Sequence, residues 1–141
     1  MNDARVFEGG CLCGAVRWRA VGEPLWVAHC HCHMCRKNSG AEYVTGAGFR
    51  PSDLTWTAEK PVFYDSEFEG RKAKRAFCPR CGSWQSWHYM EEDVMITLGS
   101  FDHPEELRPQ FHSMTEGQLP WVESYDSLPR HKQFAGKSSR G

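Results

Sequence analysis

The chain of 141 residues contains 40% apolar residues and has a formal net charge of −1, from 17 basic and 18 acidic side chains. This length suits a single domain that buries about two-thirds of its unfolded surface. The balanced charge argues against a nucleic-acid-binding protein, which would need a basic surface. No apolar run approaches the roughly 20 residues of a membrane-spanning helix, and residues 1–10 resemble neither a signal peptide nor an anchor. We therefore expect a cytoplasmic protein without nucleic-acid or membrane partners.

Short alternating segments, separated by Gly, Pro and Asp, predict a mainly β protein with little helix. In chain order, we expect strands at residues 15–20, 25–28, 42–49, 54–57, 62–64, 73–77, 83–88 and 94–98. One helical turn is expected after Cys32 and another at Pro104, because proline suits the first position of a helix. No acidic residue occurs from Ser127 onward, so we place a single domain at 1–130 and a basic, disordered tail at 131–141.

The first and last of three cysteine clusters predict one structural zinc site. The first cluster is a C-x-C pair and the last is a C-x-x-C pair, and together they supply the four thiolates of a tetrahedral zinc shell. We call these four cysteines the closed centre: Cys11, Cys13, Cys78 and Cys81. A glycine follows each pair, at Gly14 and Gly82, where it permits the positive φ of a tight turn. The metal would then join the N-terminal hairpin to the middle of the sheet.

The middle cluster supplies only three thiolates, and we call it the open centre: Cys30, Cys32 and Cys35. In an extended segment, Cys30 and Cys32 lie on the same side of the chain, and Cys35 follows after one turn. Three protein ligands leave one coordination position for water or a substrate atom, as in catalytic zinc sites. A thiol that enters this position would bind as a thiolate at neutral pH. The open centre therefore predicts catalysis on a thiol.

Two alternatives for the cysteines stay open. A histidine could complete the open centre and make it structural, but His29, His31 and His33 alternate with the cysteines. Because side chains alternate along an extended segment, we expect these histidines to point away from the metal; His31 or His33 could still act as an acid or base. Disulfides are the second alternative, but seven cysteines in tight clusters and a reducing compartment favour metal ligation.

Basic residues follow the cysteine clusters. Arg36 comes directly after the open centre, and a guanidinium group binds a carboxylate through paired hydrogen bonds. Arg36 is therefore a candidate substrate-binding residue for a carboxylate of the thiol, although a solvated structural role is equally open. The basic run at residues 71–75 is better explained as a charged strand edge that resists aggregation.

Three motifs contain all seven cysteines, and a fourth follows them: Gly10-Cys11-x-Cys-Gly14; Cys30-x-Cys-x-x-Cys-Arg-Lys37 with Ser39-Gly40; Phe77-Cys-x-x-Cys-Gly-Ser83; and Gly99-Ser-Phe-Asp-x-Pro104. With these motifs, the chain resembles the glutathione-dependent formaldehyde-activating enzyme family, which also includes centromere protein V. The resemblance runs from about Gly9 to Pro129. It is specific for the family and less specific for one reaction.

The resemblance implies a β-tent fold of packed antiparallel sheets, a structural zinc on the closed centre and a catalytic zinc on the open centre. In the founding activity of this family, the thiol of glutathione adds to formaldehyde and gives S-hydroxymethylglutathione; in reverse, this is a carbon–sulfur lyase reaction. We therefore expect an enzyme with two zinc ions per chain, a glutathione-type thiol and a small aldehyde as substrates. The alternative is a zinc-stabilised binding module without catalysis. The sequence gives no indication of the oligomeric state.

Overall fold

The computed structural model describes residues 4–68, 70–89, 93–123 and 126–133. In these residues, ten strands form two sheets, and there is a single α-helix. The predicted mainly β fold with little helix is confirmed. Within the described part of the chain, no helix is long and apolar enough to cross a membrane.

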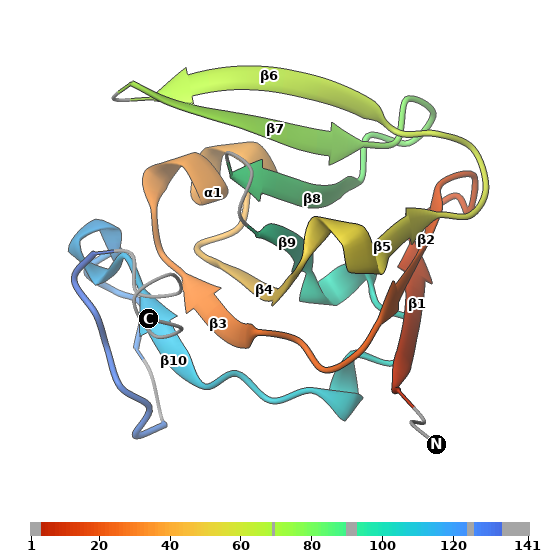
Figure 1. Cartoon of the computed structure of the whole chain (residues 1–141). Helices are drawn as coiled ribbons and strands as arrows, with labels where there is room; N and C mark the ends of the chain where they lie inside the picture. The colour runs from red at the N-terminus through yellow and green to blue at the C-terminus, as the bar shows by residue number, and fades with distance from the viewer. Residues whose placement is uncertain (1–3, 69, 90–92, 124–125, 134–141) are drawn as a thin grey trace.

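The smaller sheet has the order β1-β2-β5 and lies at one end of the molecule (Figure 1). Its antiparallel strands are β1 (Val6–Gly10), β2 (Arg17–Val21) and β5 (Leu54–Trp56). The turn between β1 and β2 contains Cys11 and Cys13. Trp18 of β2 is completely buried and packs edge-on against Phe101, with ring centroids 4.7 Å apart. This packing fixes the position of the first cysteine pair relative to the rest of the core.

The larger sheet has the order β10-β3-β4-β9-β8-β7-β6. Its strands are β3 (Trp26–Cys30), β4 (Val44–Phe49), β6 (Val62–Phe68), β7 (Arg71–Phe77), β8 (Trp84–Tyr89), β9 (Val94–Thr97) and β10 (Phe111–Ser113). All neighbouring strands are antiparallel except β10, which runs parallel to β3. The long connection after β9 crosses the molecule before it reaches β10, and this return path sets the parallel direction (Figure 1).

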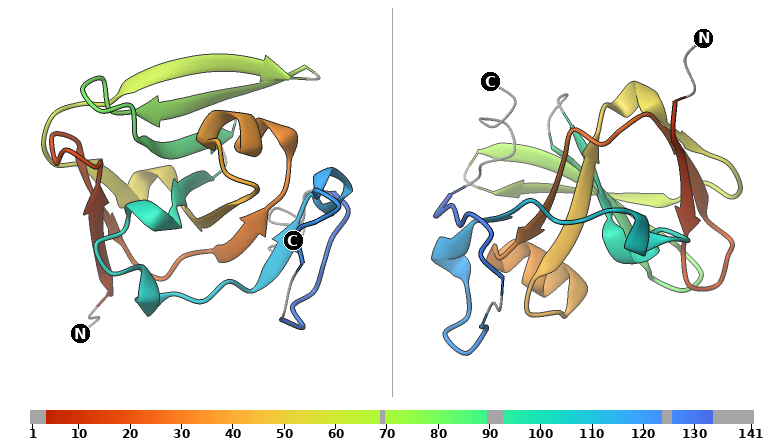
Figure 2. Two further views of the ribbon diagram at one scale, coloured as in Figure 1. Left: turned by 180° about the vertical axis from the view of Figure 1, so that it is seen from behind. Right: turned by 90° about the horizontal axis from the view of Figure 1, so that it is seen from below.

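One α-helix, α1 (His33–Ser39), follows β3 directly (Figures 1 and 2). It begins after Cys32, as predicted, and ends at Gly40, which has a φ of 75°. Four short 3-10 helices complete the described elements: η1 (Pro51–Asp53), η2 (Leu98–Ser100), η3 (Pro104–Glu106) and η4 (Thr115–Gly117). The turn expected at Pro104 is thus present as η3.

The β6–β7 hairpin is longer than the sequence predicts. Its outer half pairs opposite charges across the strands, with Asp65 opposite Lys74 and Glu67 opposite Lys72. Such pairs stabilise a hairpin without the apolar alternation by which strands are recognised. The interpretation of the basic run as a sheet edge is wrong, because β6 covers β7, and Arg75 is buried. β1 and β10 also lack clear alternation and were not among the expected strands.

Two glycines of β4 allow large side chains to lie close to the sheet. A Cβ atom at Gly48 would come within 2.3 Å of the Trp26 ring, and one at Gly46 within 2.2 Å of the Met95 sulfur. Trp26 and Met95 belong to the same buried cluster as Cys32 and Cys35. The glycines therefore shape the core beside the open centre.

The C-terminal segment is hydrogen-bonded to the domain as far as it is described. The His131 amide donates to the His112 carbonyl at 2.9 Å, and the Met114 amide donates to the Gln133 carbonyl at 3.3 Å. The remainder of the predicted tail, residues 134–141, lies outside the described residues, and its disorder stays a prediction.

Candidate metal centres and active site

The structure brings the four cysteines of the closed centre together. Their Sγ atoms all lie within 4.8 Å of one another, with Cys13 3.6 Å from Cys11 and 3.7 Å from Cys78. With zinc–sulfur bonds of about 2.3 Å, the sulfur atoms of a tetrahedral site are roughly 3.8 Å apart. All seven cysteines are free thiols. The closed centre therefore fits a tetrahedral zinc ion.

Two similar turns present these sulfur atoms. The amide of Gly14 donates to the Cys11 carbonyl at 3.1 Å, and the amide of Gly82 donates to the Cys78 carbonyl at 2.8 Å. The φ angles of Gly14 and Gly82 are 83° and 77°, as predicted from their place after each pair. A side chain at either position would be strained, because L-residues rarely adopt this conformation.

Polar groups around the closed centre favour thiolates. The Val16 amide donates to the Cys11 sulfur at 3.2 Å. The Ser83 hydroxyl lies 3.1 Å from the Cys81 sulfur, and this hydrogen bond, helped by the Ser83 amide, lowers the pKa of Cys81 to about 5. A negatively charged sulfur is the form that binds a metal.

The three cysteines of the open centre also come together, with all Sγ atoms within 4.8 Å. Cys30 ends β3, and its sulfur lies 3.6 Å from that of Cys35. The sulfur of Cys32 accepts the Cys35 amide at 3.3 Å and so caps the first turn of α1. Within the described ranges, no histidine or acidic side chain joins this group. The site thus offers three protein ligands, as the spacing predicts.

The thiols of the open centre share their charge unevenly. Hydrogen bonds from Cys30 and Cys35 lower the pKa of Cys32 to about 3. The bond to Cys32 raises the pKa of Cys30 to about 12, and the pKa of Cys35 is also raised by its bonds to the other two thiols. Without a cation, the cluster holds about one thiolate, because further negative charges at such short distances repel each other. A divalent cation compensates two of the three thiolate charges, and three thiolates with one open position are a donor set that fits zinc.

The nearby histidines lie away from the three sulfur atoms, as alternation predicts. His31 is completely buried, and its Nε2 lies 3.0 Å from Nδ1 of His112. His33 is exposed at the start of α1. The expected role of His31 or His33 as an acid or base stays a prediction.

Arg36 lies on α1, directly after Cys35. Its Nε is buried and has no hydrogen-bond partner among the described residues. An unpaired buried donor is costly, because it has lost its hydrogen bonds to water. The guanidinium group therefore offers a binding position for an anion, and its contact with a substrate carboxylate stays a prediction.

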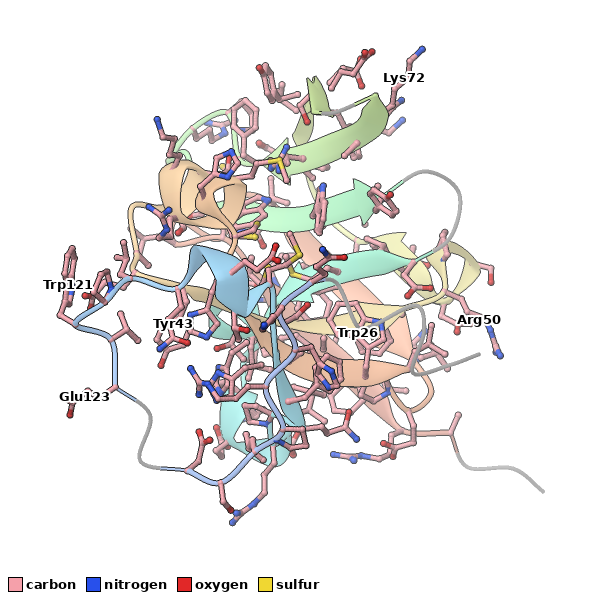
Figure 3. The ribbon with its side chains drawn as sticks, turned by 90° about the vertical axis from the view of Figure 1, so that its left-hand side faces the viewer. Trp26, Tyr43, Arg50, Lys72, Trp121 and Glu123 are labelled. Carbon is pink, nitrogen blue, oxygen red and sulfur yellow. The ribbon has the colours of Figure 1, made fainter. Side chains whose placement is uncertain are left out.

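A small hollow of about 20 Å³ lies beside the open centre. This volume accommodates one molecule of about the size of water. Its lining is mostly apolar: Trp26, Ala28, Cys30, Val44, Gly46, Trp87, Met95, Phe111 and Ser113. Two polar atoms of this lining, the Ser113 hydroxyl and Trp87 Nε1, are buried without a partner in the described part of the chain. Trp26, one of these lining residues, is labelled in Figure 3.

A surface groove of about 830 Å³ runs from the closed centre to the C-terminal end of α1. Its walls include Cys11, Ser39, Ser83 and Val44, and Val44 also lines the small hollow. This volume lies within the range of about 300–1,000 Å³ that is usual for ligand sites.

Sequence reasoning missed Ser113 and the hollow. Ser113 is opposite Cys30 in the parallel β10–β3 pair, so both side chains reach the same face. The three residues of β10 are too few to show a period. No signal in the sequence distinguishes Ser113 from the other serines that follow the last predicted strand, and its contact depends on the strand pairing.

Comparison with known proteins agrees with the motifs. The model of the family described as glutathione-dependent formaldehyde-activating enzyme matches residues 6–117. A protein of Halomonas elongata, provisionally named as such an enzyme, is 32% identical over 139 residues, covering 93% of this chain and 88% of that protein. An uncharacterized lyase of Schizosaccharomyces pombe is 27% identical over 77 residues, covering 55% of this chain and 53% of that protein.

The fold also has a counterpart among solved structures. A Rhodobacter sphaeroides protein, known from its crystal structure, shares 24% identity and a TM-score of 0.55, covering 88% of this chain and 99% of that one. This likeness concerns the fold alone. The family match covers every cysteine of both centres and confirms the resemblance carried by the motifs: the chain belongs to the glutathione-dependent formaldehyde-activating enzyme family.

Proposed function

We propose that this protein catalyses the reversible addition of a glutathione-type thiol to a small aldehyde, and so forms or cleaves an S-hydroxymethyl thiol. The observation that carries this proposal is the open centre, where three converging cysteine sulfur atoms adjoin a small, mostly apolar hollow. Family membership supports the same substrates. The closed centre would hold a second zinc ion with a structural role.

Cys30, Cys32 and Cys35 would hold the catalytic zinc. A zinc ion with one free coordination position stabilises a thiolate at neutral pH, where a free thiol of pKa about 8.5 is mostly protonated. In the reaction, the thiol loses its proton, its sulfur bonds to the carbonyl carbon, and the carbonyl oxygen takes up a proton. The three cysteines fix the place of the attacking sulfur, so that part of the acceleration comes from proximity.

The hollow is the proposed position of the aldehyde. Its volume of about 20 Å³ suits a molecule of one or two heavy atoms. Ser113 is opposite Cys30 in the strand register, and its hydroxyl lacks a partner among the described residues. This hydroxyl would donate a hydrogen bond to the carbonyl oxygen as negative charge develops there, as in other enzymes that stabilise an oxyanion. The apolar walls exclude larger polar substrates.

The thiol substrate would extend from the open centre along the surface. The buried and unpaired Nε of Arg36 supports a contact with a carboxylate. Val44, which belongs both to the hollow and to the surface groove, supports a path between the two. Glutathione has two carboxylates and a single thiol, so it meets both requirements.

The test is the rate of adduct formation from glutathione and ¹³C-formaldehyde, followed by NMR exchange measurements. The zinc-loaded protein should raise this rate above the uncatalysed reaction, and Cys35→Ser should return it to the uncatalysed value. X-ray absorption should show that the zinc gains a sulfur ligand when thiol is added. A zinc environment unchanged by thiols, together with an uncatalysed rate, would favour the binding-module alternative.

Ser113→Ala tests the role assigned to the hollow. We expect the rate constant to fall by about 10²-fold, the effect of removing one donor from an oxyanion site, with zinc content unchanged. Ser52→Ala is the matched control, because Ser52 is exposed on η1 and distant in sequence from both centres. Equal rates for both variants would remove Ser113 from the reaction.

A further inference from the structure

The β3–β10 pair presents a second cluster of metal-binding groups on the face opposite the sulfur atoms. In this pair, His112 is opposite His29, just as Ser113 is opposite Cys30. Because side chains alternate along a strand, the two histidines share the face that Cys30 and Ser113 do not use. Asp126, from the C-terminal segment, joins them there. The two clusters are thus separated by the sheet.

The distances suit ligands of one metal ion. One ligand atom from each of His29, His112 and Asp126 lies within 4.8 Å of the others. Nε2 of His112 is 3.2 Å from Oδ1 and 3.3 Å from Oδ2 of Asp126. Ligands bonded to a divalent ion at about 2.1 Å are separated by roughly 3–3.5 Å. Between these side chains, a cation can therefore bind with little rearrangement.

Both imidazole rings are also oriented as in metal sites. Nδ1 of His29 lies 2.7 Å from the Thr45 hydroxyl, and Nδ1 of His112 lies 3.0 Å from Nε2 of His31. These contacts use Nδ1 of each ring and leave Nε2 as the candidate metal-binding nitrogen, and Nε2 of His112 faces Asp126. Histidines that bind metals usually make such a hydrogen bond through the other nitrogen, which fixes the tautomer and the ring orientation.

The surroundings leave an entry path on one side. The side chain of His112 is 4% exposed, whereas that of Asp126 is 39% exposed. The ring of Tyr43, labelled in Figure 3, packs edge-on against that of His29 at a centroid distance of 5.3 Å. An ion would therefore enter past Asp126 and keep water in its remaining positions.

We propose that His29, His112 and Asp126 form a third metal site, for a first-row divalent transition ion, separate from both cysteine centres. Two imidazoles and one carboxylate suit zinc, cobalt, nickel or ferrous iron rather than calcium or magnesium, which prefer oxygen ligands. The site does not depend on the proposed reaction. The same three side chains could instead form a hydrogen-bonded network without an ion, and the experiment separates these two outcomes.

The experiment uses the full chain with both cysteine centres saturated with zinc, and cobalt(II) as the added ion. Calorimetry should show one further ion bound per chain. The visible spectrum of the bound cobalt(II) should contain d–d bands and lack the sulfur-to-cobalt charge-transfer band of a cysteine site. Binding of no ion beyond those held by the cysteines, or a spectrum with charge transfer, would overturn the proposal. Binding only at millimolar cobalt would do the same.

Variants locate the ion. His29→Asn and Asp126→Asn should each abolish the additional binding without changing the zinc content, whereas Thr45→Val should weaken it by about 10–100-fold, the usual effect of losing an orienting hydrogen bond. His103→Asn is the control, because His103 is an exposed histidine outside the cluster. Since Asp126 is partly exposed, its variant should keep the fold even where changes at the buried His112 do not. Equal cobalt binding by His103→Asn and Asp126→Asn would overturn the proposal.

Discussion

The closed and open centres differ mainly in what they connect. Cys13 and Cys78 of the closed centre are 65 positions apart, whereas Cys30 and Cys35 of the open centre are only 5 apart. A crosslink between distant segments restricts the unfolded chain strongly, and a local one restricts it little. The closed centre is therefore suited to stabilise the fold, and the open centre can be committed to chemistry.

Burial does not follow the proposed roles of the two centres, because each contains buried cysteines. Cys13 of the closed centre is exposed but Cys78 is completely buried, and in the open centre Cys32 and Cys35 are 4% and 1% exposed. The hollow beside Cys30 nevertheless gives the open centre an unfilled space of its own. A buried site excludes bulk water, which strengthens the electrostatic interactions inside it. Accessibility of a cysteine is thus a poor guide to its role in this protein.

The largest expected effect concerns stability. Cys81→Ser should lower the free energy of unfolding by about 5 kcal/mol or more, since structural zinc contributes on the order of 10 kcal/mol in small sites. Cys35→Ser should lower it by only about 1–2 kcal/mol, as for an ordinary buried substitution. Chemical denaturation of both zinc-loaded variants measures the difference. Equal losses would mean that the open centre is structural too.

Metal removal should separate the centres next. A mild chelator should take zinc from the open centre first, because three protein ligands hold it less tightly than four. Catalysis of adduct formation should then be lost while the far-UV circular dichroism stays native. A zinc indicator, circular dichroism and the NMR assay can follow the same sample. Simultaneous loss of zinc, activity and fold would contradict the division between the centres.

Zinc binding to the open centre should depend steeply on pH. At pH 7, Cys32, with a pKa of about 3, is a thiolate, whereas Cys30, with a pKa of about 12, and Cys35, with its raised pKa, carry protons. Binding must remove these protons, so about two are released per zinc, and affinity should rise roughly 100-fold per pH unit near neutrality. Calorimetry in buffers of different ionisation enthalpy counts the protons. Release of about three would show that Cys32 is also protonated.

The sequence was informative wherever the required signal is local. The cysteine spacings and the glycines that follow them predicted both clusters and the positive φ of Gly14 and Gly82. By contrast, the contact between Ser113 and the hollow, and the pairing of His112 with His29, depend on β10. That strand has three residues and runs parallel to a distant partner, so no period or turn in the sequence specifies its register.

The smallest expected effect concerns the substrate carboxylate. Arg36→Ala should weaken binding of glutathione by about 1.5–3 kcal/mol more than binding of an uncharged thiol of similar size, as expected for a charge-assisted hydrogen bond. Titration of both thiols against both zinc-loaded proteins gives this difference and cancels any effect on the zinc itself.

Lys37→Ala is the matched control, because Lys37 is the next cation on α1 and is exposed. If the positive charge acted only at long range, Arg36→Ala and Lys37→Ala would weaken glutathione binding equally. If Arg36→Ala weakened binding of both thiols equally, the substrate carboxylate would not bind at Arg36. A selective loss in Arg36→Ala alone would show that the open centre recognises its thiol through the half-buried Arg36. Arg80, beside the closed centre, is by contrast exposed and paired with Glu59.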